Sequence, residues 1–148
     1  MPCTIAGLAQ RLQLPGDYLP EQGLTEHHAY GGSVRIPYVD ANGQETGARL
    51  MRSFEGPDQF RWLRGVKIAL YGLGRIANTN DTDAVTLVVN EPDCWALWWE
   101  GGFQAVGLPG VNNWKEDRDA VYFARFNRVY VAVQSVPAAR QQASRARG

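Results

Sequence analysis

Two carboxylates, Glu91 and Asp93, follow an apolar run rich in β-branched residues, Val85 to Val89. Such a run is typical of a buried strand, and carboxylates beyond a strand end are the oxygen ligands that Mg²⁺ uses in phosphoryl transfer. A structural explanation competes with this one. Asp93 is a favourable N-cap for a following helix, and the helix dipole favours Glu91 as a solvated turn residue. We therefore expect both residues to lie at the start of a helix. The alternative is that their carboxylates hold a metal ion.

A basic segment with interleaved aromatic residues suggests a second chemistry. Arginine side chains can contact successive phosphates of single-stranded nucleic acid, while Phe60 and Trp62 stack on its bases. The alternation in residues 60–64 fits equally well a sheet with one apolar face and one solvated arginine face. The candidate nucleic-acid-binding residues are Arg49, Arg52, Arg61, Trp62, Arg64, Lys67, Lys115 and Arg140.

A glycine pair offers a third possibility. Gly72 and Gly74 belong to a G-x-G-x-x-A pattern that follows an apolar run, as in dinucleotide-binding turns. The polar stretch 78–83 follows these glycines too closely for a full helix to form between them. No acidic residue follows at the spacing that a dinucleotide-binding turn requires. A nucleotide-binding α/β domain stays an alternative, and a simple turn at these glycines is the favoured interpretation.

Other reactive side chains indicate no site. Adjacent histidines on a loop usually point apart, so His27 and His28 predict no metal site with Cys3. Neither cysteine lies in a C-x-x-C pair, and we expect Cys94 in the core. The sequence has no G-x-S-x-G motif for a serine nucleophile.

Composition excludes some classes of protein. The 148 residues carry 15 basic and 15 acidic side chains, so the net charge is zero, unlike that of a very basic DNA-binding domain. No apolar run approaches the roughly 18 residues of a membrane span. The first twelve residues lack the pattern of a signal peptide. We expect a cytoplasmic protein with a reduced pair of cysteines.

The second half of the chain alternates strands and helices. We expect strands at 85–89, 104–108 and 128–133, with helices at 94–100 and about 116–125. A right-handed crossover makes the first two strands parallel. We also expect the segments that end near residues 89 and 133 to be parallel neighbours. Trp95, Trp98 and Trp99 have helical spacing and are expected to pack against this sheet.

The first half predicts a small α+β subdomain. The expected elements are a helix at 5–12, a further turn at 17–23, and strands at 33–39, 45–54 and 59–63. These strands form an antiparallel meander over about 33–64, with Pro37 arguing for an edge position. We place a linker at 78–84, between an N-terminal subdomain, 1–77, and a parallel core, 85–148. A short helix is also possible in 137–148.

The second half resembles the Toprim domain of DNA primases and of phage-type primase-helicase proteins. The helix, Asp93 at its start, the exit GLPGVNNW (107–114) and the strand RVYVAV (128–133) match that family. The first half matches more loosely through RIPY (35–38), FRW (60–62) and LYGL (70–73). The family's acidic positions are not matched, because they fall on Val89, Gln134 and Val136.

The resemblance implies an α/β fold with a partial Toprim, Rossmann-like parallel sheet, truncated at its C-terminal side. It implies a domain of a primase-like replication protein, whose relatives make RNA primers with Mg²⁺. We expect this copy to be inactive or nearly so, with no cofactor and no metal. The alternative is a non-catalytic module that binds nucleic acid or protein. The implied partners are single-stranded DNA or replication proteins, with a helicase module in the parent chain of a phage or mobile element.

Overall fold

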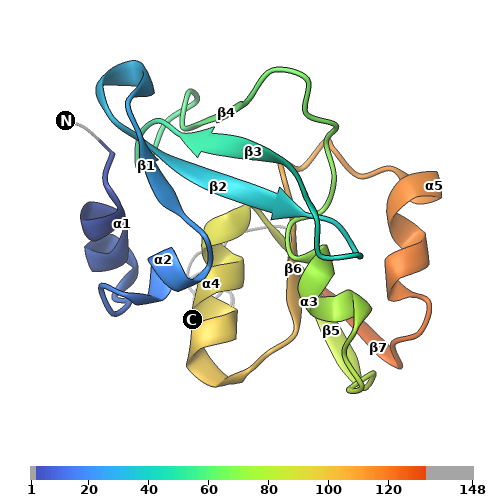
Figure 1. The fold of residues 1–148 in the computed structure, drawn as a ribbon. Helices are drawn as coiled ribbons and strands as arrows, with labels where there is room; N and C mark the ends of the chain where they lie inside the picture. The colour runs from blue at the N-terminus through green and yellow to red at the C-terminus, as the bar shows by residue number, and fades with distance from the viewer. Residues whose placement is uncertain (1–2, 133–148) are drawn as a thin grey trace, which may run out of the picture. The chain divides into compact units, whose positions relative to one another are not determined.

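The computed structural model describes residues 3–132, which form the two compact units introduced below. Figure 1 labels their helices and strands. One unit holds an antiparallel sheet and the other a parallel sheet, so the structure confirms the expected α/β fold with an antiparallel meander in its first half. Residues 133–148, which include the end of the expected strand 128–133, Arg140 and the possible C-terminal helix, lie outside the described part.

The first unit is built around a four-stranded antiparallel sheet in the order β1-β2-β3-β4. Its strands are β1 (Thr25–His27), β2 (Ser33–Val39), β3 (Glu45–Met51) and β4 (Phe60–Trp62), and its helices are α1 (Ile5–Leu12), α2 (Tyr18–Glu21) and the 3₁₀ turn η1 (Ala29–Gly31). Sequence analysis missed β1, which has only three residues. Thr4 caps α1 by accepting a hydrogen bond from the backbone N–H of Gly7 at 3.0 Å.

The expected edge position of the strand with Pro37 is wrong for the strand as a whole. β2 lies between β1 and β3, so it is central. Its pairing with β1 ends at Arg35, however, while Pro37 is paired with Ala48 of β3 alone. The missing N–H of Pro37 therefore interrupts no ladder on the β1 side.

The second unit contains a three-stranded parallel sheet in the order β6-β5-β7. Its strands are β5 (Ala84–Val89), β6 (Ala105–Leu108) and β7 (Arg128–Val131), and its helices are α3 (Leu73–Ala77), α4 (Glu91–Gly101), α5 (Glu116–Asp119) and the 3₁₀ turn η2 (Ala120–Phe123). The order follows the expected crossovers, with β5 in the centre. The single helix expected at about 116–125 is instead α5 followed by η2.

Helix α4 presents its tryptophans unevenly. Trp95 is fully buried and Trp98 is 8% exposed, whereas Trp99 is 50% exposed. The expectation that all three pack in the core is therefore wrong for Trp99. The i, i+3, i+4 spacing puts the three rings on one side of α4, but Trp99 lies at the margin of the stripe that is centred on the buried Glu91, Trp95 and Trp98. Cys94 is buried, as expected.

The packing around β7 differs from that around β5. Val85, Leu87 and Val106 belong to a core cluster with Phe123 and Phe126. All four residues of β7 are exposed, and Val129 and Val131 line an apolar hollow of about 430 Å³ together with Leu87, Leu108, Trp114, Ala120 and Phe123. Strand β7 is thus an edge strand whose apolar side chains meet solvent.

The compact units do not divide where the sequence suggested a linker. Within the described residues, the first comprises 3–40 and 44–67, and the second comprises 41–43 and 68–132. The polar stretch 78–84 lies within the second unit. There, Gln104 donates hydrogen bonds to the carbonyls of Asp81 and Ala84. The division into an N-terminal subdomain, 1–77, and a Toprim-like core, 85–148, stays a prediction.

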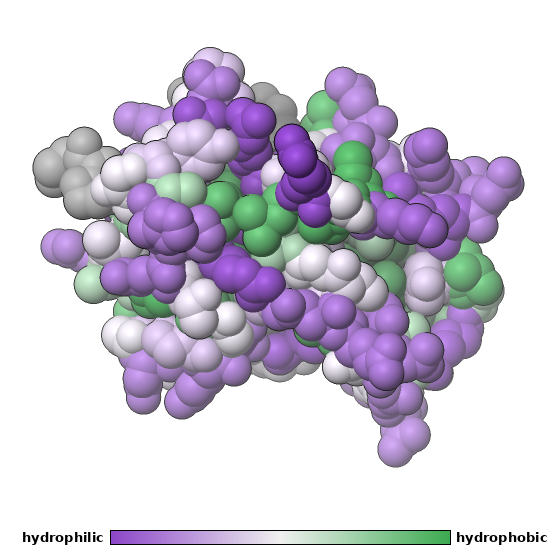
Figure 2. All heavy atoms as spheres, turned by 45° about the horizontal axis from the view of Figure 1, so that its top comes forward, coloured by the Kyte–Doolittle hydropathy of each residue, from purple (hydrophilic) through white to green (hydrophobic). Residues whose placement is uncertain are grey.

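One face of the molecule is largely polar (Figure 2). In Figure 2, hydrophilic residues cover most of the visible face, with smaller hydrophobic patches among them. No helix within residues 3–132 combines the length and the apolar character needed to cross a bilayer.

Candidate functional site

The carboxyl ends of β5, β6 and β7 meet at one edge of the parallel sheet. Val89 pairs with Leu108 of β6, and Leu87 pairs with Val131 of β7, in parallel register. The segments ending near residues 89 and 133 were expected to be parallel neighbours, and this is confirmed for β5 and β7. In an open parallel sheet this edge, with the central strand flanked by its two neighbours, is where ligands bind.

A tight turn at Asn90 takes the chain from β5 directly into α4. Asn90 has φ 68° and ψ 170°, and its N–H donates to the carbonyl of Leu108 at 2.8 Å. A Cβ on Gly107 would lie 2.9 Å from the Asn90 carbonyl oxygen and 3.2 Å from Cys94 Sγ. Glycine at position 107 is what allows α4 to begin so close to β6.

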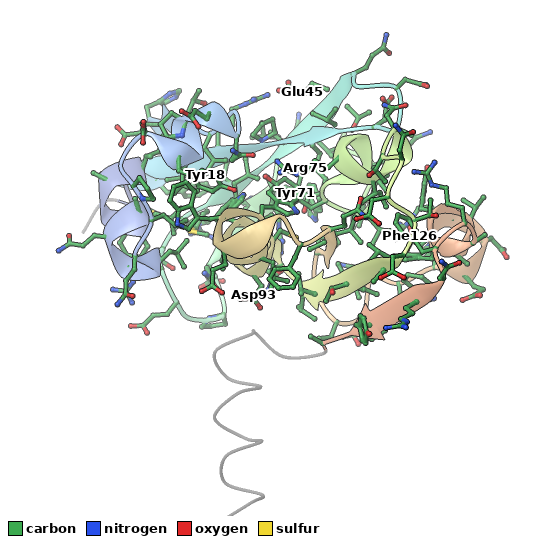
Figure 3. All side chains as sticks on the ribbon, turned by 90° about the horizontal axis from the view of Figure 1, so that it is seen from below. Tyr18, Glu45, Tyr71, Arg75, Asp93 and Phe126 are labelled. Atoms are coloured by element: carbon green, nitrogen blue, oxygen red, sulfur yellow. The ribbon has the colours of Figure 1, made fainter. Side chains whose placement is uncertain are left out.

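The structure changes the roles expected for the two carboxylates. Helix α4 begins at Glu91 with Asn90 as the N-cap, so Asp93 lies inside the first turn and does not cap it. Glu91 is fully buried and Asp93 is 6% exposed, so Glu91 is not a solvated turn residue. Figure 3 labels Asp93 on α4. Both carboxylates still lie where the helix dipole favours negative charge.

These carboxylates act on the neighbouring thiol. Burial raises the pKa of Cys94 well above its ordinary value, and the charges of Glu91 and Asp93 raise it further. A thiol in this environment stays protonated and unreactive. Cys94 is therefore a packing residue.

The edge of the sheet does not fit a magnesium site. Mg²⁺ keeps several of its waters and reaches its carboxylates from solvent, whereas the Glu91 side chain has no exposed surface. Across residues 3–132, no three His, Cys, Asp or Glu side chains are grouped so as to hold a metal ion. Val89 brings no donor atom, and Gln134 and Val136 lie outside the described residues. We derive no metal-dependent step.

The two histidines do not point apart as expected. The rings of His27 and His28 stack with centroids 4.6 Å apart and planes 18° from parallel. His27 Nδ1 accepts a hydrogen bond from the backbone N–H of Ala29 at 3.1 Å. That nitrogen is thereby engaged in shaping the turn before β2.

An aromatic cluster fixes α4 against the rest of the second unit. Trp95 Nε1 donates to the Tyr71 hydroxyl at 2.9 Å, and Trp98 Nε1 donates to the Ala105 carbonyl at 3.1 Å. Burial raises the pKa of Tyr71 far above its ordinary value, so its hydroxyl stays protonated. Arg75 covers the Trp98 ring, with Cζ 4.0 Å from the centroid. Figure 3 labels Tyr71 and Arg75 in this region.

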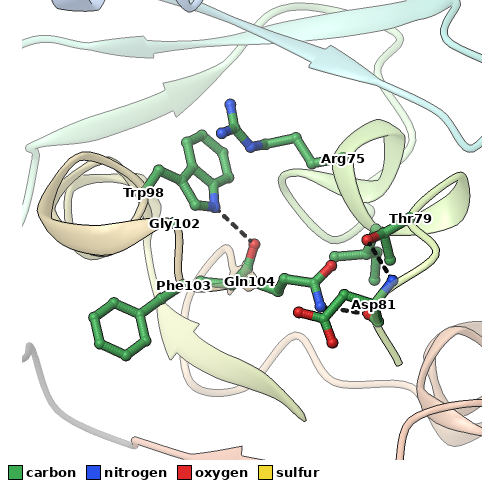
Figure 4. A pocket seen from close by; sticks show the side chains of 9 residues that line it. Arg75, Thr79, Asp81, Trp98, Gly102, Phe103 and Gln104 are labelled. Atoms are coloured by element: carbon green, nitrogen blue, oxygen red, sulfur yellow. Dashed lines mark hydrogen bonds between the residues drawn. The ribbon is translucent and has the colours of Figure 1, made fainter. Parts of the chain in front are cut away.

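A pocket of about 270 Å³ opens beside Trp98, near the amino ends of β5 and β6 (Figure 4). Its polar lining comes from Arg75, Thr79, Asp81 and Gln104. Gln104 Nε2 donates to the Asp81 carbonyl at 2.5 Å, and the N–H of Asp81 donates to Thr79 Oγ1 at 3.2 Å. Through these hydrogen bonds, Gln104, Asp81 and Thr79 hold the loop before β5 in place.

The glycine pattern has a packing explanation. Gly72 has φ 93° and caps α3, and a Cβ there would lie 2.9 Å from the Trp98 ring and 3.3 Å from the Ala105 carbonyl. Helix α3 has only five residues, too short for the helix that a dinucleotide fingerprint requires. Gly72 is needed for close approach of the chain to α4, so packing explains this glycine without a nucleotide.

The basic segment of the first unit divides into two groups by its contacts. In one, Arg49 Cζ lies 4.0 Å from the Phe60 centroid and 5.4 Å from that of Trp62, while Trp62 meets Tyr38 edge-on at 4.7 Å. Arg49 is only 7% exposed. The expectation that the arginines lie on a solvated face is therefore wrong for Arg49. Its guanidinium group packs against the rings of Phe60 and Trp62.

The second group lies around Tyr30. Arg52 Cζ is 4.0 Å and Arg61 Cζ 5.9 Å from the Tyr30 ring centroid. Strand alternation places Arg61 on the face opposite Phe60 and Trp62. The structure thus brings Arg52 and Arg61 together and separates them from Arg49 and Trp62. Sequence analysis missed Tyr30, for which the only local signal was the Gly31-Gly32 pair that follows it.

The other candidates are not gathered at one place by the described contacts. Arg64 and Lys67 are exposed in the segment after β4, and Lys115 is exposed before α5 in the second unit. The backbone N–H of Lys115 donates to buried Asp119 at 3.0 Å, and Asp119 in turn pairs with Arg118 at 2.6 Å. Arg140 lies outside the described residues.

Comparison with known proteins shows a primase-related fold. No protein-family model matches the chain, and no curated protein matches it either. Among solved structures, the DnaG primase catalytic domain bound to ssDNA matches with a TM-score of 0.67 at 15% identity, covering 95% of this chain and 56% of that one. The DnaG catalytic core gives 0.62 at 17% identity, with coverages of 95% and 57%.

The primase fragment of the bacteriophage T7 primase-helicase protein matches with a TM-score of 0.61 at 14% identity, covering 92% of this chain and 58% of that one. The chain therefore spans a little over half the length of these primase chains. At such identities the likeness shows the fold, which is that of primase catalytic domains.

Proposed function

We propose that this chain is the Toprim-type part of a primase-like replication protein and that it binds single-stranded nucleic acid without making primers itself. The observation that carries the proposal is the β6-β5-β7 parallel sheet with α4 after its central strand, in a fold similar to DnaG catalytic domains over 95% of the chain. One of those domains was solved with ssDNA bound.

The chemistry of the sheet edge supports a binding role over a catalytic one. Primer synthesis in the family that this chain resembles uses Mg²⁺, which neutralises phosphate charge during transfer. Here the carboxylates next to the edge are buried, and Val89 stands at the end of the central strand. The exposed cations Arg61, Arg64 and Lys67 remain suited to phosphates.

Titration of a labelled single-stranded oligonucleotide tests the proposal. The intact chain should bind it with an affinity that falls as salt rises, because phosphate contacts release counterions. The affinity should be the same with Mg²⁺ or with EDTA, and a priming assay with nucleoside triphosphates should yield no product. Primer synthesis would contradict the non-catalytic role, and absence of salt-dependent binding would contradict the binding role.

A protein-interaction module is the second candidate, and one observation favours it. Strand β7 exposes Val129 and Val131 beside the apolar hollow at Trp114 and Phe123. Such exposed apolar surface is often an interaction site. This candidate predicts no affinity for the oligonucleotide at any salt concentration, so the same titration separates it from the first.

Installing the missing acids tests the alignment of the site. The triple variant V89E, Q134D and V136D should gain affinity for Mn²⁺ or Mg²⁺ in a calorimetric titration, because three carboxylates would then stand at the positions that the resemblance assigns. The control variant V129E, Q134N and V136N also changes three residues. It does not place three carboxylates at positions 89, 134 and 136. Equal metal binding by both variants would show that the alignment is incorrect.

A further inference from the structure

Tyr30 adopts a backbone conformation that large side chains avoid. It has φ 60° and ψ 31° inside η1, in the left-handed region, and Gly31 and Gly32 after it also have positive φ. For a bulky residue this conformation is unfavourable, and such outliers gather where a side chain must be held in a particular place. The glycines could supply the turn by themselves, so the turn does not account for a tyrosine at position 30.

The Tyr30 ring is also open to solvent. It is 47% exposed, the turn η1 has no buried residue, and so the ring contributes little to the core. Exposed aromatic rings on a polar surface are well suited to bind planar ligands, since they offer apolar area at low entropic cost.

Two guanidinium groups accompany the ring. Arg52 lies within stacking distance at 4.0 Å, and its half-buried side chain holds the ring from one direction. Arg61 is exposed and 5.9 Å from the centroid, which is beyond stacking contact, so it leaves the ring accessible. A ring with a cation beside it matches one nucleotide, in which a flat base is joined to a phosphate.

From these contacts we infer that Tyr30 is a stacking residue for one base of a single strand, with Arg61 contacting the adjacent phosphate and Arg52 positioning the ring. The inference rests on the proposed nucleic-acid binding and adds a residue and a mode of recognition. Because bases in a duplex are already stacked on each other, this site takes single strands in preference to duplexes.

A structural role for Tyr30 is the competing explanation, and it predicts different results. If the ring only shielded Arg52, its removal would lower stability and leave binding unchanged in the folded protein. Position 30 has the left-handed conformation that glycine adopts freely, so Tyr30→Gly should fold. This variant removes the ring without adding backbone strain.

The test uses the full chain and a short fluorescent oligothymidylate. Tyr30→Phe keeps the ring and should bind like the wild type, whereas Tyr30→Leu and Tyr30→Gly should bind about 5- to 100-fold more weakly, the range expected for loss of one stacked base. The salt dependence should not change in these variants, because no charge is removed. Arg61→Gln should instead reduce the slope of log affinity against log salt by about 0.7.

Photo-crosslinking gives an independent readout. An oligonucleotide carrying 5-iodouracil should form an adduct that mass spectrometry locates at Tyr30, and a hairpin duplex should not. Wild-type affinity in both Tyr30→Leu and Tyr30→Gly, or adducts only elsewhere, would overturn the stacking role while nucleic-acid binding stood. If the wild-type chain bound no oligonucleotide at any salt concentration, the proposed function and this inference would both be overturned.

Discussion

Two aromatic clusters of this protein, one in each unit, differ in what their rings do. In the parallel unit, Trp95 and Trp98 are buried and each donates a hydrogen bond, to Tyr71 and to the Ala105 carbonyl. In the antiparallel unit, Tyr30 is half exposed beside the guanidinium groups of Arg52 and Arg61. Rings of the first kind hold a fold together, and rings of the second kind remain available to a ligand.

The same contrast applies to charge. The parallel unit buries Glu91, Asp93 and Asp119, whereas Arg61, Arg64 and Lys67 of the antiparallel unit, which lie within β4 or follow it, are exposed. Buried charges must be satisfied within the protein, so they are poorly placed to bind a partner. Buried charge gives the edge of the parallel sheet a structural role, and the exposed cations make the antiparallel unit the better place to seek binding.

Removing a buried ring should have the largest effect. Trp95→Ala should lower the free energy of unfolding by about 3–5 kcal/mol, because it leaves a cavity and removes the hydrogen bond that Trp95 donates to the Tyr71 hydroxyl. Trp99→Ala is the matched control on the same helix, and since Trp99 is 50% exposed it should change stability by no more than about 0.5 kcal/mol. Urea titration followed by circular dichroism measures both, and equal losses would contradict the assignment of the two faces.

The two cysteines can report on each unit separately, since Cys3 belongs to the antiparallel unit and Cys94 to the parallel one. Burial raises the pKa of Cys3 to about 11 and that of Cys94 well above its ordinary value. At pH 8, the raised pKa of Cys3 alone reduces its thiolate fraction about a hundredfold relative to a free thiol. Labelling with a maleimide should therefore be slow in the native protein and fast in urea.

Single variants Cys3→Ser and Cys94→Ser assign the two labelling rates by mass spectrometry. Different rates at intermediate urea would show that the units open separately, which would sharpen the comparison between them. Native labelling as fast as labelling in urea would contradict the burial of these thiols.

Close packing at the sheet edge should make Gly107 intolerant of a side chain. Gly107→Ala should cost about 1–3 kcal/mol, because its Cβ would lie 2.9 Å from the Asn90 carbonyl oxygen. Gly16→Ala is the control, since no atom lies within 4 Å of its Cβ position, and it should be neutral or slightly stabilising. Thermal unfolding of both variants checks this, and a neutral Gly107→Ala would mean that α4 is not tightly packed on β6.

The surface ion pair of the antiparallel unit should have the smallest effect. The hydrogen bond from Arg35 lowers the pKa of Glu45, at 2.9 Å. Its stabilisation is therefore present above the ordinary pKa of Glu45 and is lost as the pH falls through the lowered value. Because Glu45 is 48% exposed, Glu45→Gln should cost no more than about 0.5 kcal/mol, and less in high salt.

Unfolding of Glu45→Gln at several pH values, beside Glu55→Gln as an exposed control, measures this contribution. The Glu45→Gln variant should lose part of the stability increase between acidic and neutral pH. A larger effect than that of Gly107→Ala would reverse the ranking of buried and exposed interactions.

Much of the fold follows from local sequence patterns. Helix α1 has the expected bounds, and β2, β4, β5 and β6 lie within a residue or so of the expected strands. These segments have clear periodicity or compact apolar runs bounded by turn residues. The three-residue β1 and the split of α5 from η2 were not predictable in this way, because very short elements depend on their partners more than on their own residues.

The sequence by itself determined the order of most strands and helices and the parallel pairing of β5 with β6, since apolar runs, turns and crossover handedness act over short stretches of chain. Only the tertiary structure decided that Trp95 is inside while Trp99 is outside, that Glu91 is buried, and that Arg52 rather than Arg49 accompanies the exposed ring of Tyr30. The physical reason is that exposure depends on what packs over a residue. Periodicity places a side chain on a face but does not say what covers that face.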